Sequence, residues 1–206
     1  MTVIVDYGLG NLASIQNMLR YLGYPSKISG DITDLVQAER IILPGVGAFD
    51  NGIKKIRKLG LVEVLNQKVL QEKIPVLGIC LGMQLMTEGS DEGFEPGLGW
   101  MEGRAVAFRF PERTALRIPH MGWNIVSVKK NMFLTNNFLP EMRFYFVHSY
   151  HVVCKNKSDV LLSADYGGEI TAAVAKDNIM GTQFHPEKSH RFGMLVLKNF
   201  MEIPHA

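Results

Sequence analysis

The sequence reads Gly78-Ile79-Cys80-Leu81-Gly82 at the end of an apolar run that begins at Ile74. A short apolar run of this kind is typical of a buried strand, and the residues after it can begin a helix. Glycines on both sides of a cysteine permit the tight strand-to-helix turn of a nucleophile elbow. At such a turn the helix N-terminus favours the thiolate, and the Leu81 N–H can stabilise an oxyanion. The pentapeptide therefore predicts a nucleophilic Cys80 in an α/β fold.

Apolar runs and amphipathic stretches alternate through the first ninety residues. Strands are predicted at residues 3–5, 41–43 and 74–79, and one helix at residues 61–72. Asn11 and Gly23 are typical of the start and stop of another helix. Strands separated by helices favour a parallel sheet with right-handed crossovers.

The second half of the chain has a different texture, with short apolar runs separated by a few polar residues. After a loop through Gly99, strands are predicted at residues 105–110, 124–128, 143–153, 160–164, 171–175 and 179–184. This density favours antiparallel strands, with a tight turn at Asp177-Asn178 and a final helix capped by Ser189. We therefore predict one domain over residues 1–206. Its open mixed sheet has a parallel core and an antiparallel extension, with helices on both faces.

Composition narrows the class of protein. The 206 residues include only two cysteines, without the spacing of a zinc site, and the formal net charge is +2. There is no basic leader and no long apolar segment, so we expect a cytoplasmic protein. Because acidic and basic residues are interspersed, we expect no nucleic acid and no membrane among its ligands. We also expect no metal and no cofactor.

A second motif, Gln183-Phe184-His185-Pro186-Glu187, lies at the end of the last predicted strand. Residues two apart in an extended chain point the same way, so His185 and Glu187 can meet. The carboxylate can orient the imidazole, which can deprotonate a thiol and later protonate a leaving amine. A single histidine on a strand is more often structural, and its pairing with Cys80 is what favours catalysis.

Two glycine-rich turns follow the first strands. The turn Pro44-Gly45-Val46-Gly47 can bring backbone N–H groups close to a ligand and complete an oxyanion hole with Leu81. The turn at residues 8–13 fits the pattern G-x-G-x-x-A, and Asp31 follows about twenty residues later. Dinucleotide binding therefore stays open as an alternative at this point.

The motifs together resemble those of the triad glutamine amidotransferases, which carry both the Cys80 elbow and the His185-Pro186-Glu187 segment in this order. Further blocks are similar to the glutaminase subunits of imidazole glycerol phosphate synthases, and they run from the first strand to the last helix: residues 6–12, 44–49, 119–124, 145–150 and 184–189. The resemblance covers essentially the whole chain.

The resemblance implies hydrolysis of L-glutamine. Cys80 would form a thioester, His185 would carry the protons and Glu187 would orient His185. Leu81 and the backbone of Gly45, Val46 and Gly47 would hold the oxyanion. The residues that match the family's glutamine-binding positions are Gln84, Glu92, Ser149 and Tyr150.

The resemblance also implies a partner, a (β/α)₈ barrel synthase that receives the ammonia in histidine biosynthesis and forms a heterodimer with this subunit. The positions that match its docking face are Asn11, Met121, Trp123 and Lys188, although Trp123 could equally belong to the core. We expect low activity without the partner, because glycine-rich loops such as the one at Pro44 flip peptides easily.

Three further alternatives stay open. The ammonia could serve amidation of a surface sugar, or the triad could act on another amide or a redox substrate. The chain could also be a non-catalytic assembly subunit.

Overall fold

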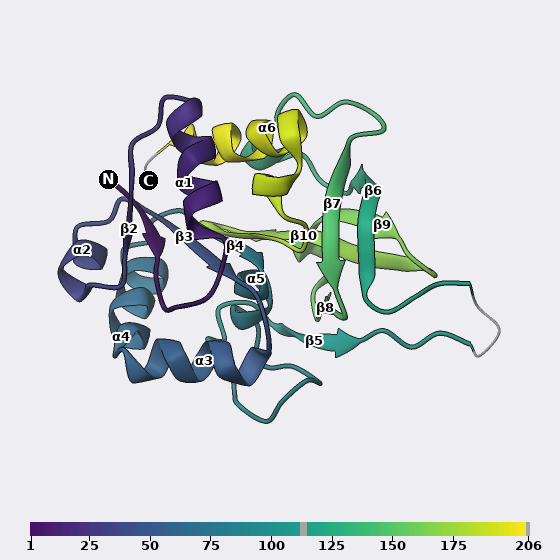
Figure 1. The fold of residues 1–206 in the computed structure, drawn as a ribbon, viewed down its shortest axis with the longest axis horizontal. Coiled ribbons are helices and arrows are strands. Elements are labelled where there is room, and N and C mark those ends of the chain that lie inside the picture. The colour runs from purple at the N-terminus through teal and green to yellow at the C-terminus, as the bar shows by residue number, and fades with distance from the viewer. Residues whose placement is uncertain (112–114, 205–206) are drawn as a thin grey trace.

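One sheet of nine strands runs through the molecule (Figure 1). The computed structural model describes residues 1–111 and 115–204. In chain order, the strands of this sheet are β1 (Thr2–Val5), β2 (Ser26–Ser29), β3 (Arg40–Gly45), β4 (Val76–Cys80), β6 (His120–Val128), β7 (Arg143–His148), β9 (Val160–Asp165), β10 (Glu169–Lys176) and β11 (Ile179–Thr182).

The order of these strands across the sheet is β2-β1-β3-β4-β11-β10-β9-β6-β7. The first five are parallel to one another, and the other four continue the sheet in antiparallel pairing. The prediction of a parallel core with an antiparallel extension is therefore confirmed. The carboxyl ends of β3, β4 and β11 lie side by side, where open α/β sheets bind their ligands.

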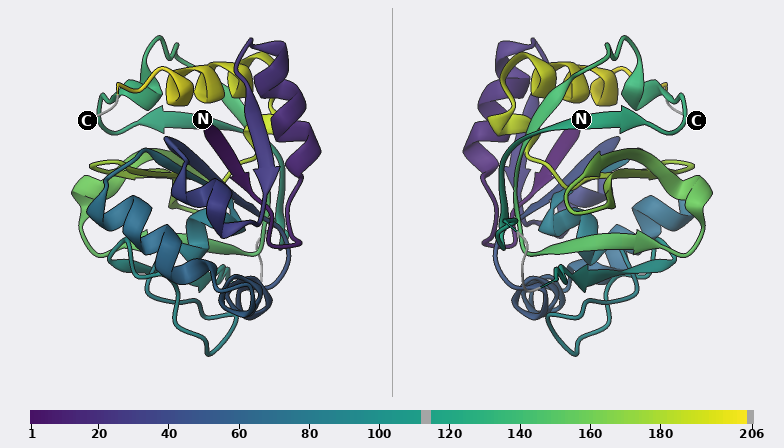
Figure 2. Two further views of the ribbon diagram at one scale, coloured as in Figure 1. Left: turned by 90° about the vertical axis from the view of Figure 1, so that its left-hand side faces the viewer. Right: turned by 90° about the vertical axis from the view of Figure 1, so that its right-hand side faces the viewer.

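Helices cover both faces of the sheet, as predicted. On one face lie α1 (Leu12–Tyr21) and α6 (His190–Met201), at the top of Figure 1. On the other face lie α2 (Ile32–Val36), α3 (Phe49–Lys58), α4 (Leu61–Asn66) and α5 (Leu81–Leu85), and Figure 2 shows the two layers from the side. Within the described ranges, no helix combines the length and the apolar character that a membrane crossing requires.

The apolar runs of the parallel strands are buried on both faces because successive side chains point to opposite sides. In β1, Val3 and Val5 pack in the core beneath α3 and α4, whereas Ile4 packs in the core beneath α1 and α6. These side chains are fully buried. Each such burial stabilises the fold by about 1.5–3 kcal/mol.

A two-stranded antiparallel ribbon formed by β5 (Gly103–Ala107) and β8 (Tyr150–Cys154) lies outside the main sheet. The single strand predicted at residues 143–153 is therefore wrong. It is two strands, β7 and β8, and the chain passes from one sheet to the other at Ser149. No glycine or proline marks this change of direction, so the apolar pattern runs through it.

Other differences concern elements that lack a clean apolar pattern. The predicted elements omit the polar strand β2 and the helices α2 and α3, although α3 has a buried stripe of Phe49, Ile53 and Ile56. The helix predicted at residues 61–72 is α-helical only to Asn66 and then widens into a π-helical turn, Gln67–Gln71.

Candidate active site

Cys80 is the last residue of β4 and directly precedes α5. Its backbone is strained, with φ 54° and ψ −109°, which an L-residue rarely adopts. The flanking glycines are needed for close packing. A Cβ on Gly82 would lie 1.8 Å from the Leu43 carbonyl oxygen, and one on Gly78 would lie 2.7 Å from the Met83 nitrogen. The predicted elbow is therefore present, with the positive φ at the cysteine itself.

His185 and Glu187 are paired through their side chains. The Nδ1–H of His185 donates to Oε1 of Glu187 over 2.8 Å, and both side chains are almost completely buried. The segment between them is a 3₁₀ turn, η4 (Pro186–Lys188), and β11 ends earlier, at Thr182. The predicted proximity is thus found, but a helical turn produces it, where an extended chain was expected.

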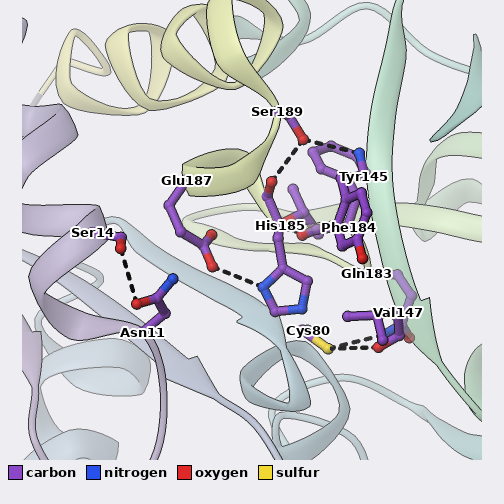
Figure 3. Close-up of polar contacts among 11 residues, drawn as sticks. Asn11, Ser14, Cys80, Tyr145, Val147, Gln183, Phe184, His185, Glu187 and Ser189 are labelled. Atoms are coloured by element: carbon purple, nitrogen blue, oxygen red, sulfur yellow. Dashed lines mark hydrogen bonds and ion pairs between the residues drawn. The ribbon is translucent and has the colours of Figure 1, made fainter. Parts of the chain in front are cut away.

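The imidazole of His185 lies between the Glu187 carboxylate and the Cys80 sulfur (Figure 3). Its Nε2 atom, on the side facing the sulfur of Cys80, makes no hydrogen bond to a described residue. Burial lowers the pKa of His185, but the neighbouring Cys80 thiol and Glu187 carboxylate raise it more strongly, to about 9. The surroundings therefore favour an imidazolium next to the sulfur.

The backbone around His185 is tied to strand β7. The His185 N–H donates to the Tyr145 carbonyl over 2.9 Å, and the Tyr145 N–H donates to the Ser189 hydroxyl over 3.0 Å. That hydroxyl in turn donates to the His185 carbonyl over 2.6 Å. Ser189 thus occupies the predicted cap position of α6, but its side chain serves these bonds and makes no cap bond. This network places His185 over the end of β4.

An open cleft of about 610 Å³ lies above Cys80. Its walls include most of the residues predicted for the site: Val46, Gly47, Cys80, Leu81, Gln84, Glu92, Ser149, Tyr150, His185 and Lys188. Glu187 does not line the cleft and instead contacts His185. Gly45 is also absent from the walls, because it is buried at the end of β3 with Tyr7, Leu81 and Gly82 packed around it.

The loop predicted to hold an oxyanion is anchored by Tyr7. The buried hydroxyl of Tyr7 donates to the Pro44 carbonyl over 2.6 Å. A Cβ on Gly45 would lie 2.4 Å from that hydroxyl oxygen, so only glycine fits there. Val46 is 41% exposed and Gly47 has φ 96°. The backbone is therefore anchored at Pro44, and the residues that follow it, Val46 and Gly47, form an exposed turn at the cleft.

Glu92 reaches the cleft from a loop that is attached to the start of α3. Its Oε2 accepts a hydrogen bond from the Phe49 N–H over 2.8 Å. Asp50 holds the same loop by accepting from the N–H groups of Phe94 and Glu95, over 3.2 and 3.1 Å. Sequence reasoning missed this role of Asp50, because the residues that it binds are more than forty positions away.

The predicted docking residues lie at the surface. Met121 and Trp123 are 61% and 45% exposed on β6, so Trp123 is not a core residue. The Trp123 ring stacks on His190 with centroids 5.6 Å apart, and the Lys188 ammonium lies 5.7 Å from the centre of the Tyr145 ring. Asn11 precedes α1 and accepts a hydrogen bond from the Ser14 hydroxyl over 2.9 Å.

Buried histidines form a second polar feature beside the cleft. Nδ1 of His120 lies 2.9 Å from Nε2 of His148, and Nδ1 of His148 lies 2.8 Å from the Tyr150 carbonyl oxygen. Burial lowers the pKa of His120 to about 4 and that of His148 to about 3. In the part of the chain that the structure describes, no three His, Cys, Asp or Glu residues are placed to hold a metal ion.

Comparison with known proteins identifies the family. The sequence model described as Glutamine amidotransferase class-I matches residues 3–203. A Pseudomonas aeruginosa protein named imidazole glycerol phosphate synthase subunit HisH 2 is 51% identical over 203 residues, covering 98% of this chain and 100% of that protein. A Methanococcus maripaludis protein of the same name is 48% identical over 202 residues, with 98% and 99% covered.

Solved structures share the fold at lower identity. A crystal structure of a glutamine amidotransferase superimposes with a TM-score of 0.73 at 19% identity, covering 97% of both chains. The structure of PurLQS from Thermotoga maritima gives a TM-score of 0.71 at 21% identity, covering 97% of this chain and 96% of that one. The family model matches nearly the whole chain, and the Pseudomonas and Methanococcus relatives share about half of its residues. This chain therefore belongs to the class-I glutamine amidotransferase family.

Proposed function

We propose that this chain is the glutaminase subunit of an imidazole glycerol phosphate synthase. It hydrolyses L-glutamine and delivers the ammonia to a synthase subunit. The observation that carries the proposal is the buried His185–Glu187 pair, which faces Cys80 at the floor of an open cleft. The names of relatives that match over their full length support the choice of synthase.

In the first half of the reaction, the sulfur of Cys80 attacks the γ-carboxamide carbon of glutamine. The carbonyl oxygen becomes an oxyanion, for which the N–H of Leu81 and those of the Gly45-Val46-Gly47 turn are the proposed donors. The imidazolium of His185 then protonates the departing nitrogen, and ammonia leaves a γ-glutamyl thioester on Cys80. The raised pKa of His185 suits this step, because the ring is protonated when the leaving group needs a proton.

In the second half, water replaces ammonia. Neutral His185 takes a proton from the water, whose oxygen attacks the thioester carbon, and glutamate departs as the sulfur is released. Glu187 stabilises the imidazolium that forms and keeps Nδ1 protonated, so that Nε2 faces the reacting atoms.

The walls of the cleft supply a carboxylate for the α-amino group of the substrate and polar groups for the rest of it. The carboxylate of Glu92 can accept hydrogen bonds from the substrate ammonium, and its loop is held in place through Asp50. Gln84 and the Ser149-Tyr150 segment also line the cleft and are proposed to position the rest of the molecule.

The partner is proposed to be a (β/α)₈ barrel synthase that docks over Asn11, Met121, Trp123 and Lys188. Exposed apolar side chains on β6 give that face the aromatic character of an interface core. Lys188 lies both at this face and in the cleft, so docking can alter the site directly. We therefore propose that the partner, when it carries its own ligand, activates the glutaminase.

An alternative acceptor is a surface sugar. The same glutaminase chemistry would supply ammonia to a paralogous synthase that amidates such a sugar. Complementation separates the two acceptors. A strain that lacks its own glutaminase subunit and needs histidine should grow when this chain is supplied with its partner, and failure to grow would favour the sugar.

Glutamate release by the chain with its barrel partner tests the chemistry. We expect Cys80→Ala to abolish glutamate release but to leave synthesis from added ammonium salts intact. An active Cys80→Ala protein would point to an assembly role. If the wild-type pair released no glutamate under any acceptor condition, the glutaminase assignment would be wrong.

A further inference from the structure

A continuous chain of hydrogen bonds through two buried glutamines connects the sulfur of Cys80 to a backbone carbonyl of β8. Nε2 of Gln183 lies 3.7 Å from the sulfur of Cys80, and Oε1 of Gln183 lies 3.2 Å from Nε2 of Gln84. That same Nε2 lies 3.1 Å from the Tyr150 carbonyl oxygen. Gln183 is fully buried and Gln84 is 5% exposed. The side-chain amide of Gln183 is fully buried beside the sulfur of Cys80, and the proposed roles of Cys80, His185 and Glu187 do not explain why a polar group lies there.

The orientation of both amides follows from one backbone carbonyl. The Tyr150 oxygen can only accept, so the Gln84 atom next to it must be the NH₂ nitrogen. The second hydrogen of that nitrogen points to Gln183, which must therefore present its oxygen. Consequently the NH₂ group of Gln183 is directed at Cys80, and the opposite amide orientation would place two donors against each other.

The two buried histidines strengthen this anchor. The Tyr150 oxygen also accepts from Nδ1–H of His148, whose Nε2 accepts from Nδ1–H of His120. Asn124 then donates to Nε2 of His120 over 3.3 Å. These bonds run in one direction, from Asn124 through His120 and His148 to the Tyr150 carbonyl, which therefore accepts from both His148 and Gln84.

We propose that Gln183 is a further catalytic residue, whose side-chain amide donates a hydrogen bond to the sulfur of Cys80 and stabilises the thiolate. Gln84 acts through it as a positioning residue. Hydrogen bonds to a charged sulfur favour the charged form over the thiol. The proposal rests on Cys80 being the nucleophile of the proposed glutaminase. It adds a donor from the segment after β11 that also carries His185, two residues further along the chain.

Alkylation of Cys80 by iodoacetamide across a pH series tests this donor without requiring glutamine turnover. The background is Cys154→Ala, so that only one thiol reacts, and Cys154 lies away from the cleft in β8. In Gln183→Leu we expect the midpoint of the pH–rate profile to rise by about one pH unit, as for loss of one hydrogen bond to a charged group. At pH below the midpoint, alkylation should slow by roughly tenfold.

Two variants separate this role from a purely structural one. In Gln84→Leu the donor of Gln183 remains but loses its orientation, so the midpoint should rise less than in Gln183→Leu. An equal or larger rise would overturn the proposal, because it would assign the effect to Gln84. An unchanged midpoint in Gln183→Leu would overturn it as well, since the amide would then only support Gln84.

Gln183→Met covers the case in which Gln183→Leu does not fold. Its side chain has nearly the same size but carries no N–H donor, so we expect the midpoint to rise about as far. A folded Gln183→Met protein with an unshifted midpoint would contradict the proposal. Glutamate release by the wild-type pair is measured separately, so failure of the glutaminase assignment is distinguishable from failure of this inference.

Discussion

Nδ1 of His185 lies 2.8 Å from Oε1 of Glu187, and the two side chains are only 2% and 1% exposed. Removing one partner of such a pair has a larger effect than at a surface ion pair, because the remaining charge is buried and unpaired. The carboxylate fixes which ring nitrogen carries the proton and raises the pKa of the imidazole. Its effect can therefore be measured both as a rate and as a pH dependence.

Replacing Glu187 by Gln should lower kcat/KM for glutamine by about 10²-fold to 10⁴-fold, because the amide loses the charge that supports the imidazolium. The alkaline limb of the pH–rate profile should also move to lower pH, since Glu187 contributes to the raised pKa of His185. Steady-state assays of the chain with its partner check both. Glu202→Gln, which changes an exposed carboxylate bonded to Tyr24, is the matched control. An alkaline limb that does not move would argue against this role.

Acid should destabilise the fold through the buried histidines. His120 and His148 have folded-state pKa values of about 4 and about 3, below the ordinary value of 6.5. Between the folded-state pKa values and 6.5, the unfolded chain binds more protons than the folded chain. The stability contributed by the two neutral histidines is therefore full above pH 6.5 and is lost as the pH falls. His185 has the opposite sign, because its pKa is raised, and its contribution is lost as the pH rises from 6.5 through about 9.

His120→Gln checks this sign. We measure the free energy of unfolding in urea from pH 8 to pH 4 and plot it against pH. Below pH 6.5 the slope for His120→Gln should be smaller than that for wild type by up to about 1.4 kcal/mol per pH unit. Above pH 7.5 the two curves should run parallel, because His120 is neutral in both the folded and unfolded states there. Equal slopes below pH 6.5 would mean that His120 does not titrate differently on folding.

Gly82→Ala should cost about 2–4 kcal/mol of unfolding free energy, because the new Cβ would lie 1.8 Å from the Leu43 carbonyl oxygen and the backbone must shift. Glutaminase activity should fall with it, since the shift moves Cys80. Gly60→Ala is the comparison, because that glycine has φ 68° but open space around its Cβ position. Strain alone should cost about 1–2 kcal/mol there. Equal losses would show that the close approach at Gly82 is unimportant.

Asp50→Ala should raise KM for glutamine by roughly tenfold with a smaller change in kcat, as for loss of binding common to substrate and transition state. The reason is that the Phe94 and Glu95 N–H groups lose their acceptor, and the loop that carries Glu92 loosens. Steady-state kinetics measures the two constants. Asp31→Ala, at an exposed acid whose side chain makes no cap bond to α2, should change neither. A fall in kcat alone would contradict the positioning role of Asp50.

The sequence predicts the parts of the site that are local in the chain. The Cys80 elbow, the His185-Pro186-Glu187 segment and the Pro44 turn each follow a parallel strand, and carboxyl ends of neighbouring parallel strands meet. For this reason the cleft and its floor could be expected before the fold was known. Residues 143–153 show the limit, because a continuous apolar pattern conceals the passage between two sheets at Ser149.

The supporting contacts could not be predicted, since they join distant residues without a local pattern. The bond from Tyr7 to Pro44 spans 37 positions, that from Phe94 to Asp50 spans 44, and that from Gln183 to Cys80 spans 103. Each depends on where tertiary packing brings a polar atom near a partner. Composition and periodicity carry no information about such pairs.

Strand β7 is the last strand of the sheet in the order found here, and its outer side is covered at Tyr145 by the segment from His185 to Ser189. An uncovered edge strand offers its N–H and C=O groups to strands of other molecules and promotes aggregation. The segment from His185 to Ser189 thus also reduces the tendency of the sheet edge to aggregate. Substitutions that detach it should therefore yield protein that both precipitates and fails to turn over, because the same contacts serve activity and solubility.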